Sequence, residues 1–141
     1  MAQSVLLTIR GVQHYPQQEP EVIELVTEGT LEPVDGGWNI RYEESDLTGM
    51  AGVTTTFRIE PGQVTLLRTG KLRSEMVFKE GVCHTSLYQM DFGALMITVC
   101  ARSIEARIGP AGGTVDLLYA IEIEQSEAGL VEYHLDIETK Q

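Results

Sequence analysis

The segment "TTTFRIEPGQVTLLR", residues 54–68, contains two runs in which apolar and polar residues alternate, separated by a Pro-Gly dipeptide at 61–62. Alternation with a period of two places every second side chain on one face of a β-strand, and Pro-Gly is a common turn dipeptide. A turn of even length at this point pairs Thr55 with Arg68 across the two strands. The segment therefore predicts a β-hairpin with one apolar face.

The rest of the chain repeats this pattern of short alternating segments between turn signals. The segments are rich in Val, Ile, Thr, Tyr and Phe, and none has the length and periodicity of a helix. Such regular spacing predicts an all-β domain, residues 1–141, built as an antiparallel meander of about nine strands; closing it into a barrel would remove its unpaired edges. The turn signals are VDGG at 34, EPGQ at 60, KEG at 79, MDFG at 90, GPAGG at 109 and EAG at 127.

The charge balance narrows the range of partners. The chain has 21 acidic and 10 basic residues and a net charge of −11, which argues against nucleic acid and against an anionic membrane surface. No segment approaches the roughly 20 apolar residues of a membrane span. The first 15 residues lack the basic region of a signal peptide, so we expect a cytoplasmic protein. Cys83 and Cys100, which form no metal or redox motif, are then expected to be free thiols.

A series of motifs resembles a known family. In chain order these are "TTTFRI", "VTLLRTG", "MVFKEG", "YQMDFGALMITV" and "GGTVDLLYAIEI". Together they resemble the YwiB-like family of small uncharacterised bacterial proteins, from about residue 5 to about residue 137. The resemblance implies a calycin-type, lipocalin-like antiparallel β-barrel in a bacterial cytoplasmic protein. It implies no activity and no site residue.

Arg68 is the most informative single residue, because it continues the inward phase of Val64 and Leu66. An unpaired guanidinium inside a barrel is costly. One interpretation is an arginine at the barrel end that reaches solvent or bonds to loop carbonyls. The other is an anion anchor at the mouth of a pocket, opposite Thr55.

Aromatic residues form the second group of candidates. Trp38, Ile40 and Tyr42 share one face of a predicted strand, and packing alone would explain them. A barrel of about eight strands can also hold one small ligand, in which case Trp38 and Tyr42 would line the cavity. Tyr88 and Tyr119 lie on other predicted inward faces and would add apolar walls with polar tips.

His84 shares the inward face of Tyr88, and Ser86 follows two residues later. No nucleophile-elbow turn is present, and no carboxylate is in a clear position to orient His84. We therefore expect a hydrogen-bonded core histidine and predict no catalytic residue. The three histidines are far apart and the GPAGG loop has no following helix, so the sequence predicts neither a metal site nor a cofactor.

Two detailed pairings follow from the predicted turns. An even-length loop at MDFG places Cys83 opposite Cys100 on the outer face. An odd-length loop around residues 127–129 places Glu122 opposite His134.

These observations leave three hypotheses. The leading one is a non-enzymatic barrel that binds a small, partly apolar, anionic ligand in its interior. The second is an interaction or structural module whose interior is filled by its own side chains and whose surface meets a protein partner, for example a second copy of the chain in a homodimer. The third is an enzyme that uses the neighbourhood of Arg68, His84 and Tyr88. The candidate ligand-binding residues are Arg68, Trp38, Tyr42, Thr55, His84, Tyr88 and Tyr119.

Overall fold

The computed structural model describes residues 2–45, 50–90, 93–124 and 126–140, and its strands form one ten-stranded sheet. The described residues contain no helix, and the all-β prediction is confirmed with one strand more than the expected nine. The strands are β1 (Gln3–His14), β2 (Glu21–Val34), β3 (Gly37–Glu43), β4 (Val53–Glu60), β5 (Gln63–Gly70), β6 (Ser74–Lys79), β7 (Cys83–Met90), β8 (Gly93–Gly109), β9 (Gly112–Ile123) and β10 (Ser126–Thr139).

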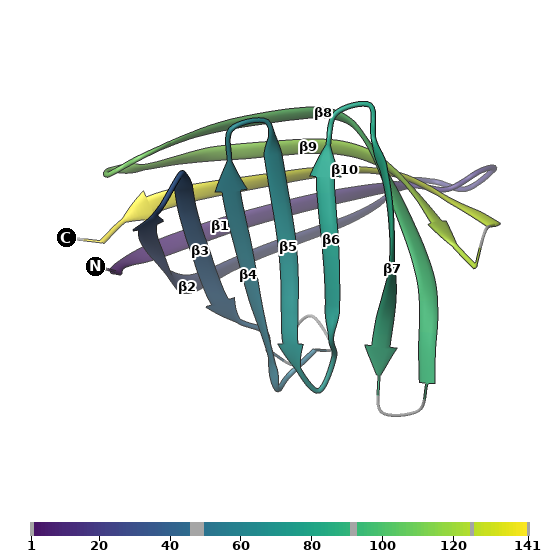
Figure 1. Cartoon of the computed structure of the whole chain (residues 1–141), viewed down its shortest axis with the longest axis horizontal. Coiled ribbons are helices and arrows are strands. Elements are labelled where there is room, and N and C mark those ends of the chain that lie inside the picture. Colours follow the sequence, from purple (N-terminus) through teal and green to yellow (C-terminus); the bar gives the residue numbers. More distant parts are fainter. Residues whose placement is uncertain (1, 46–49, 91–92, 125, 141) are drawn as a thin grey trace.

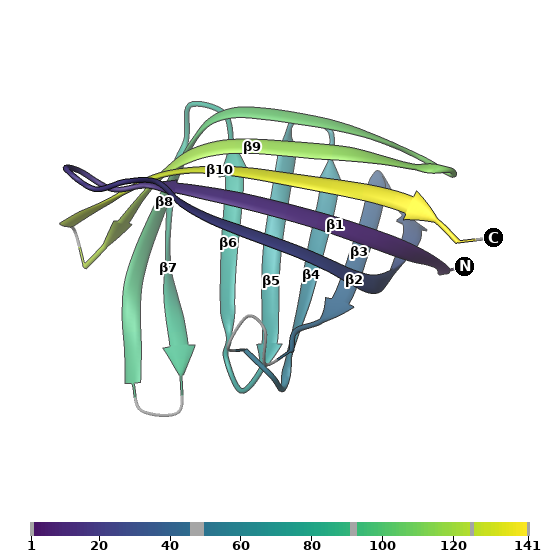
Figure 2. The ribbon, with the colours of Figure 1, turned by 180° about the vertical axis from the view of Figure 1, so that it is seen from behind.

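The sheet is a meander that folds over on itself into a nearly closed barrel. Its order is β6-β5-β4-β3-β2-β1-β10-β9-β8-β7, so chain neighbours pair and β1 also pairs with β10. In Figures 1 and 2, the short strands β4, β5 and β6 cross the long strands β1, β9 and β10 at a steep angle. The two ends of the sheet, β6 and β7, meet at two isolated bridges, Arg73↔Gln89 and Lys79↔Val82. A seam therefore lies between β6 and β7.

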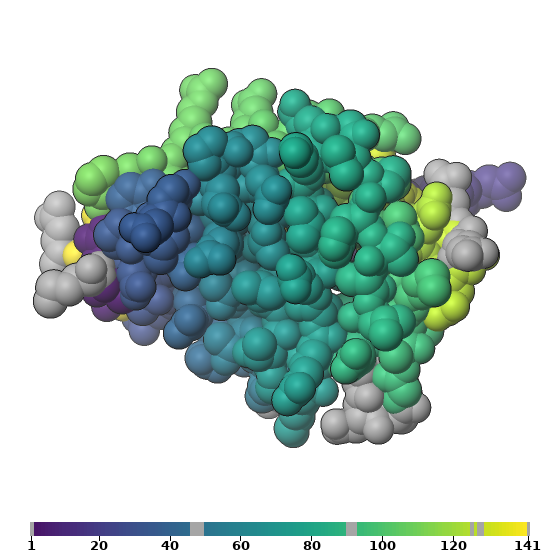
Figure 3. Space-filling view, in the orientation of Figure 1, coloured from purple at the N-terminus to yellow at the C-terminus, as the bar shows by residue number. Residues whose placement is uncertain are grey.

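Alternation along each strand produces the core. In β4, the side chains of Val53, Thr55, Phe57 and Ile59 are buried, and the residues between them are more exposed. Phe57 and Phe78 are among the largest fully buried side chains, and burial of one such side chain stabilises the fold by roughly 1.5–3 kcal/mol. In the space-filling view, side chains of β3 to β6 cover the face of the barrel that points at the reader (Figure 3).

The predicted registers of two hairpins are confirmed. Thr55 pairs with Arg68 between β4 and β5, and β7 pairs with β8 in the register predicted from the MDFG turn. The turn residues of the second hairpin, 91–92, lie outside the described residues.

Cys83 also pairs with Cys100 as predicted, but the expectation of free thiols is wrong. The two residues form a disulfide, with their Cα atoms 4.1 Å apart. The expectation rested on the cellular compartment, whereas direct pairing across two strands brings the sulfur atoms together whatever the compartment.

The register of the last hairpin differs from the prediction. Glu122 pairs with Glu127, and His134 pairs with Asp116. The predicted pair of Glu122 with His134 is therefore wrong, and His134 instead lies beside Asp116 at a partly exposed position. The strands turn closer to residue 124 than predicted, and a bulge between Glu127 and Gly129 restores the phase.

Candidate ligand-binding cavity

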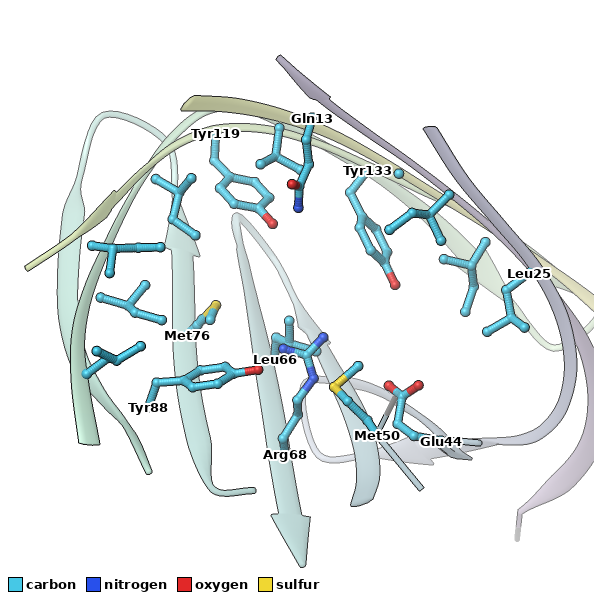
Figure 4. A pocket seen from close by; sticks show the side chains of 18 of the residues that line it. Gln13, Leu25, Glu44, Met50, Leu66, Arg68, Met76, Tyr88, Tyr119 and Tyr133 are labelled. Atoms are coloured by element: carbon cyan, nitrogen blue, oxygen red, sulfur yellow. The ribbon is translucent and has the colours of Figure 1, made fainter. Parts of the chain in front are cut away.

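The interior of the barrel contains a cavity of about 550 Å³. Most of its lining is apolar, and Arg68 and Glu44 are the charged residues among the described residues that line it (Figure 4). Phe57 lies in ring contact with Tyr133, and Phe78 with Tyr119, at centroid distances of 5.6 and 4.6 Å. The cavity is lined by Ile9, Gly11, Gln13, Ile23, Leu25, Tyr42, Glu44, Met50, Leu66, Arg68, Met76, Tyr88, Leu95, Ile97, Tyr119, Ile121, Ile123, Val131 and Tyr133.

Arg68 projects into this cavity from near the end of β5 (Figure 4). Its strand neighbours are Thr55 on β4 and Ser74 on β6. The Nε atom is buried and has no hydrogen-bond partner among the described residues, and none of the ion pairs found among those residues involves Arg68. A buried donor without a partner costs about 1–3 kcal/mol. The predicted inward position of Arg68 is therefore confirmed, and its hydrogen-bonding capacity is incompletely used.

Four of the five tyrosines line the cavity, namely Tyr42, Tyr88, Tyr119 and Tyr133. The hydroxyl groups of Tyr88, Tyr119 and Tyr133 point towards its centre, where the Arg68 guanidinium lies (Figure 4). Phenol groups in this position sit between apolar walls and a single cation.

Burial and local charge shift the pKa values of these phenols. Burial raises the pKa of Tyr42 and of Tyr119 to about 12, and it raises the pKa of Tyr133 well above its ordinary value. The positive charge of Arg68 partly opposes all three shifts. The neighbouring phenols of Tyr42 and Tyr133 also influence each other's pKa. The charge of Arg68 therefore reaches the hydroxyl groups on both sides of the cavity.

Glu44 is a cavity residue that the sequence analysis missed. Its side chain is buried, and the Thr55 hydroxyl donates a hydrogen bond of 2.5 Å to Glu44 Oε2. The negative charge of Glu44 contributes to the raised pKa of Tyr42. The alternation of Trp38, Ile40 and Tyr42 continues inward to position 44, so a carboxylate in phase with an apolar face was the available signal.

Tyr133 was the second omission. Its place in an alternating segment did not distinguish it from the packing residues around it. Its partner Gly11 on β1 leaves the space in front of its ring open. A glycine on an inward phase opposite a tyrosine was the signal for this part of the cavity.

Of the seven predicted site residues, the structure brings Arg68, Tyr42, Tyr88 and Tyr119 together around the cavity. Thr55 is fully buried and contributes through its hydrogen bond to Glu44 rather than by lining the space.

Trp38 and His84 do not line the cavity. Trp38 precedes Tyr42 by four residues, or roughly 13 Å along a strand, and it borders a separate hollow with Ile59 and Ile104. His84 is half-buried on β7, and its Nδ1 atom has no hydrogen-bond partner among the described residues. The predicted hydrogen bond of His84 is therefore absent at its Nδ1 atom among the described residues.

Two histidine–carboxylate pairs lie away from the cavity. His14 Nε2 is 2.6 Å from Glu132 Oε2, and His134 Nδ1 is 2.5 Å from Asp116 Oδ1, with both pairs partly exposed. No group of three or more His, Cys, Asp or Glu side chains among the described residues is arranged to hold a metal ion. In the part of the chain that the structure describes, no helix has the length and apolar character needed to cross a bilayer.

Comparison with known proteins places the chain in a family. The family described as a domain of unknown function, DUF1934, matches residues 7–137. The chain belongs to the DUF1934 family. A curated relative, the "Uncharacterized beta-barrel protein YwiB" of Bacillus subtilis (strain 168), is 26% identical over 89 residues, which cover 63% of this chain and 61% of that protein.

A solved structure has the same fold as this chain over nearly its whole length. The crystal structure of the ywiB protein from Bacillus subtilis matches 99% of this chain and 94% of its own chain, with a TM-score of 0.88 and 20% sequence identity. The predicted resemblance to the YwiB-like family and its β-barrel is therefore confirmed. At this identity the likeness concerns the fold, and the role of the cavity in this chain depends on the residues that line it.

Proposed function

We propose that this protein binds a small molecule with an apolar body and one anionic group inside its barrel, without catalysing a reaction. The observation that carries the proposal is the unpartnered, buried Nε atom of Arg68 in a largely apolar cavity of about 550 Å³. Sites for small molecules fall in the range of roughly 300–1,000 Å³ and combine apolar walls with a few polar groups.

The electrostatics of Arg68 support an anionic ligand. A guanidinium presents five donors in a planar fork and accepts no hydrogen bond. An anion in the cavity would accept from these donors and offset the free energy lost when Arg68 was buried. The protein as a whole carries a net charge of −11, so it would repel an anion that lacked a local cationic partner.

The rival hypotheses have less support. The enzyme hypothesis depended on His84, which does not line the cavity, and the Glu44 carboxylate that does line it already accepts a hydrogen bond from Thr55. A barrel filled by its own side chains is difficult to reconcile with a cavity of this size. A cytoplasmic location, a homodimer and the absence of nucleic-acid and membrane partners stay predictions.

Fluorescence titration with anilinonaphthalene sulfonate, a probe with one anionic group and an apolar body, tests the proposal. We expect saturable binding to the wild type and a loss of roughly 10-fold or more in affinity for Arg68→Met, because a charge-assisted hydrogen bond contributes about 1.5–3 kcal/mol. Arg58→Met is the matched control, since Arg58 lies on the neighbouring strand β4 and is exposed. It should bind the probe like the wild type.

A second variant locates the binding inside the barrel. A Cβ atom at Gly11 would meet the Tyr133 ring at 3.9 Å, an ordinary contact, and Gly11 lines the cavity. Gly11→Leu should therefore fill part of the space and weaken binding. The proposal would be contradicted if the wild type showed no saturable binding. It would also be contradicted if the Arg68→Met and Gly11→Leu variants bound the probe with the affinity of the wild type.

A further inference from the structure

We propose that the ligand is a monocarboxylate with a hydrocarbon body, and that its carboxylate is held by Arg68 together with the hydroxyl groups of Tyr88 and Tyr119. This inference rests on the proposed function and specifies the head-group site within the same cavity. The row of residues around Arg68, the hydroxyl groups of Tyr88 and Tyr119 and the position of Glu44 support it.

Arg68 and Tyr88 lie at the same level of the barrel on either side of Ser74. Ser74 is the strand partner of Arg68, and the bridge Arg73↔Gln89 places Ser74 beside Tyr88 across the seam. The two outer strands of this row are roughly 10 Å apart, a distance that two long inward side chains can span above a small serine. Figure 4 shows the Tyr88 hydroxyl directed towards the guanidinium.

Ser74 supplies a second observation at this position. Its hydroxyl is buried and, like Arg68 Nε, has no hydrogen-bond partner among the described residues. Buried polar groups in native proteins are almost always hydrogen-bonded. The two unpartnered groups lie on adjacent strands, and Arg68, which lines the cavity while Ser74 does not, offers a buried donor for a polar group that the chain itself does not provide.

The free tyrosine hydroxyls lie on the Tyr88 side of Arg68. On the other side, the phenols of Tyr42 and Tyr133 interact with each other, and Tyr42 lies close to Glu44. Tyr119 shows no such interaction: burial and the charge of Arg68 are the influences on its phenol. A carboxylate placed beside Arg68 therefore finds donors in Tyr88 and Tyr119, and it avoids the hydroxyls that are already engaged.

Glu44 sets the charge of the ligand. It and Arg68 are the charged residues among the described residues that line the cavity, and their two charges balance each other before a ligand binds. One negative charge beside Arg68 is compensated, whereas a second one would experience the repulsion of Glu44. The site therefore favours a monoanion over a dianion such as a phosphate monoester.

The walls beyond the head group determine the body of the ligand. Met76, Leu95, Ile97 and Ile121 line the cavity around Tyr88 and Tyr119, and none of them can donate a hydrogen bond from its side chain. Each buried methylene contributes about 0.8 kcal/mol, which is roughly a fourfold gain in affinity. Affinity should therefore rise through hexanoate, octanoate and decanoate.

Displacement of anilinonaphthalene sulfonate by chain-matched compounds tests the head group. We expect decanoate to bind at least 10-fold more tightly than decanol and decyl phosphate. Tyr88→Phe and Tyr119→Phe should each weaken decanoate about three- to 10-fold, in line with one hydrogen bond. Arg58→Met is the control, because Arg58 is exposed on β4 and does not line the cavity, and it should leave decanoate affinity within about twofold.

The Glu44→Gln variant removes the negative charge of Glu44 and keeps the size of its side chain. It should reduce the preference for decanoate over decyl phosphate, while the Thr55 hydroxyl can still donate to the Gln amide oxygen. Tighter binding of decyl phosphate than decanoate in the wild type would overturn the monoanion assignment. Tighter binding of α-aminodecanoate than decanoate would overturn it too, because Glu44 would then bind an ammonium group.

The two proposals fail in different ways. If decanoate and anilinonaphthalene sulfonate bind the wild type but neither Tyr88→Phe nor Tyr119→Phe weakens decanoate, the head-group site is wrong and the ligand-binding barrel stands. If the wild type binds none of these probes, the proposed function itself fails. Circular dichroism of each variant confirms that it has the all-β spectrum of the wild type before its affinity is compared.

Discussion

Replacement of Arg68 by methionine should stabilise the ligand-free protein. The buried Nε atom of Arg68 has no hydrogen-bond partner among the described residues, and such a donor costs about 1–3 kcal/mol. Methionine keeps an unbranched apolar stem in the same place and introduces no donor. We therefore expect the free energy of unfolding of Arg68→Met to exceed that of the wild type by about 1–2 kcal/mol. For a domain of this size, that corresponds to a rise of roughly 3–10 °C in Tm.

Urea unfolding monitored by tryptophan fluorescence measures this difference. Trp38 is the single tryptophan, and it borders a different hollow from the one that contains Arg68. Its emission therefore reports unfolding without direct contact with the substituted side chain. Arg58→Met, at an exposed position of β4, should lie within about 0.5 kcal/mol of the wild type.

A bound ligand should make the wild type more stable than Arg68→Met. An anionic ligand at 100 times its Kd stabilises the folded wild type by about 2.7 kcal/mol, and it should leave Arg68→Met nearly unchanged. A ligand-free Arg68→Met protein that is less stable than the wild type by more than about 1 kcal/mol would refute this reasoning. Arg68 would then serve the fold, through contacts with the barrel end, and not a ligand.

Three further predictions concern other parts of the barrel. The Cys83–Cys100 disulfide closes a loop of 17 residues, so its reduction should lower the free energy of unfolding in urea by about 3 kcal/mol. Burial raises the pKa of Tyr119 to about 12, so above pH 10 the folded state keeps the phenol proton of Tyr119 while the unfolded state loses it. The free energy of unfolding should therefore fall as the pH rises from about 10 to 12, and it should fall less steeply in Tyr119→Phe. Asp116→Asn should alter the NMR signals of the His134 ring but change the free energy of unfolding by less than about 1 kcal/mol, because the pair is half-exposed.

The sequence by itself determined the local structure and the phase of the strands. Alternation with a period of two and regularly placed turns fixed an all-β meander, because a one-residue shift would move every apolar side chain to the solvent. The same parity argument placed Thr55 opposite Arg68 and Cys83 opposite Cys100, and both pairs are present. Short, regular hairpins leave few alternatives once the turn length is known.

Registers across irregular turns were beyond the sequence. The pairing of His134 with Asp116 depends on a bulge near Gly129, and a bulge shifts the register without a distinctive residue pattern. The predicted register did place the two cysteines opposite each other, and only the structure showed that they are joined in a disulfide and are not free thiols.

The cavity was decided by the tertiary structure. Phase showed that Arg68, Tyr42, Tyr88 and Tyr119 point inward, but it could not show at which level of the barrel each lies. Trp38 has the same phase as Tyr42 and still borders another hollow, because a strand runs along the barrel wall and separates residues of one face by several ångströms. Whether inward side chains fill an interior or leave about 550 Å³ open depends on how far apart opposite walls lie, and strand tilt and closure of the whole sheet set that distance.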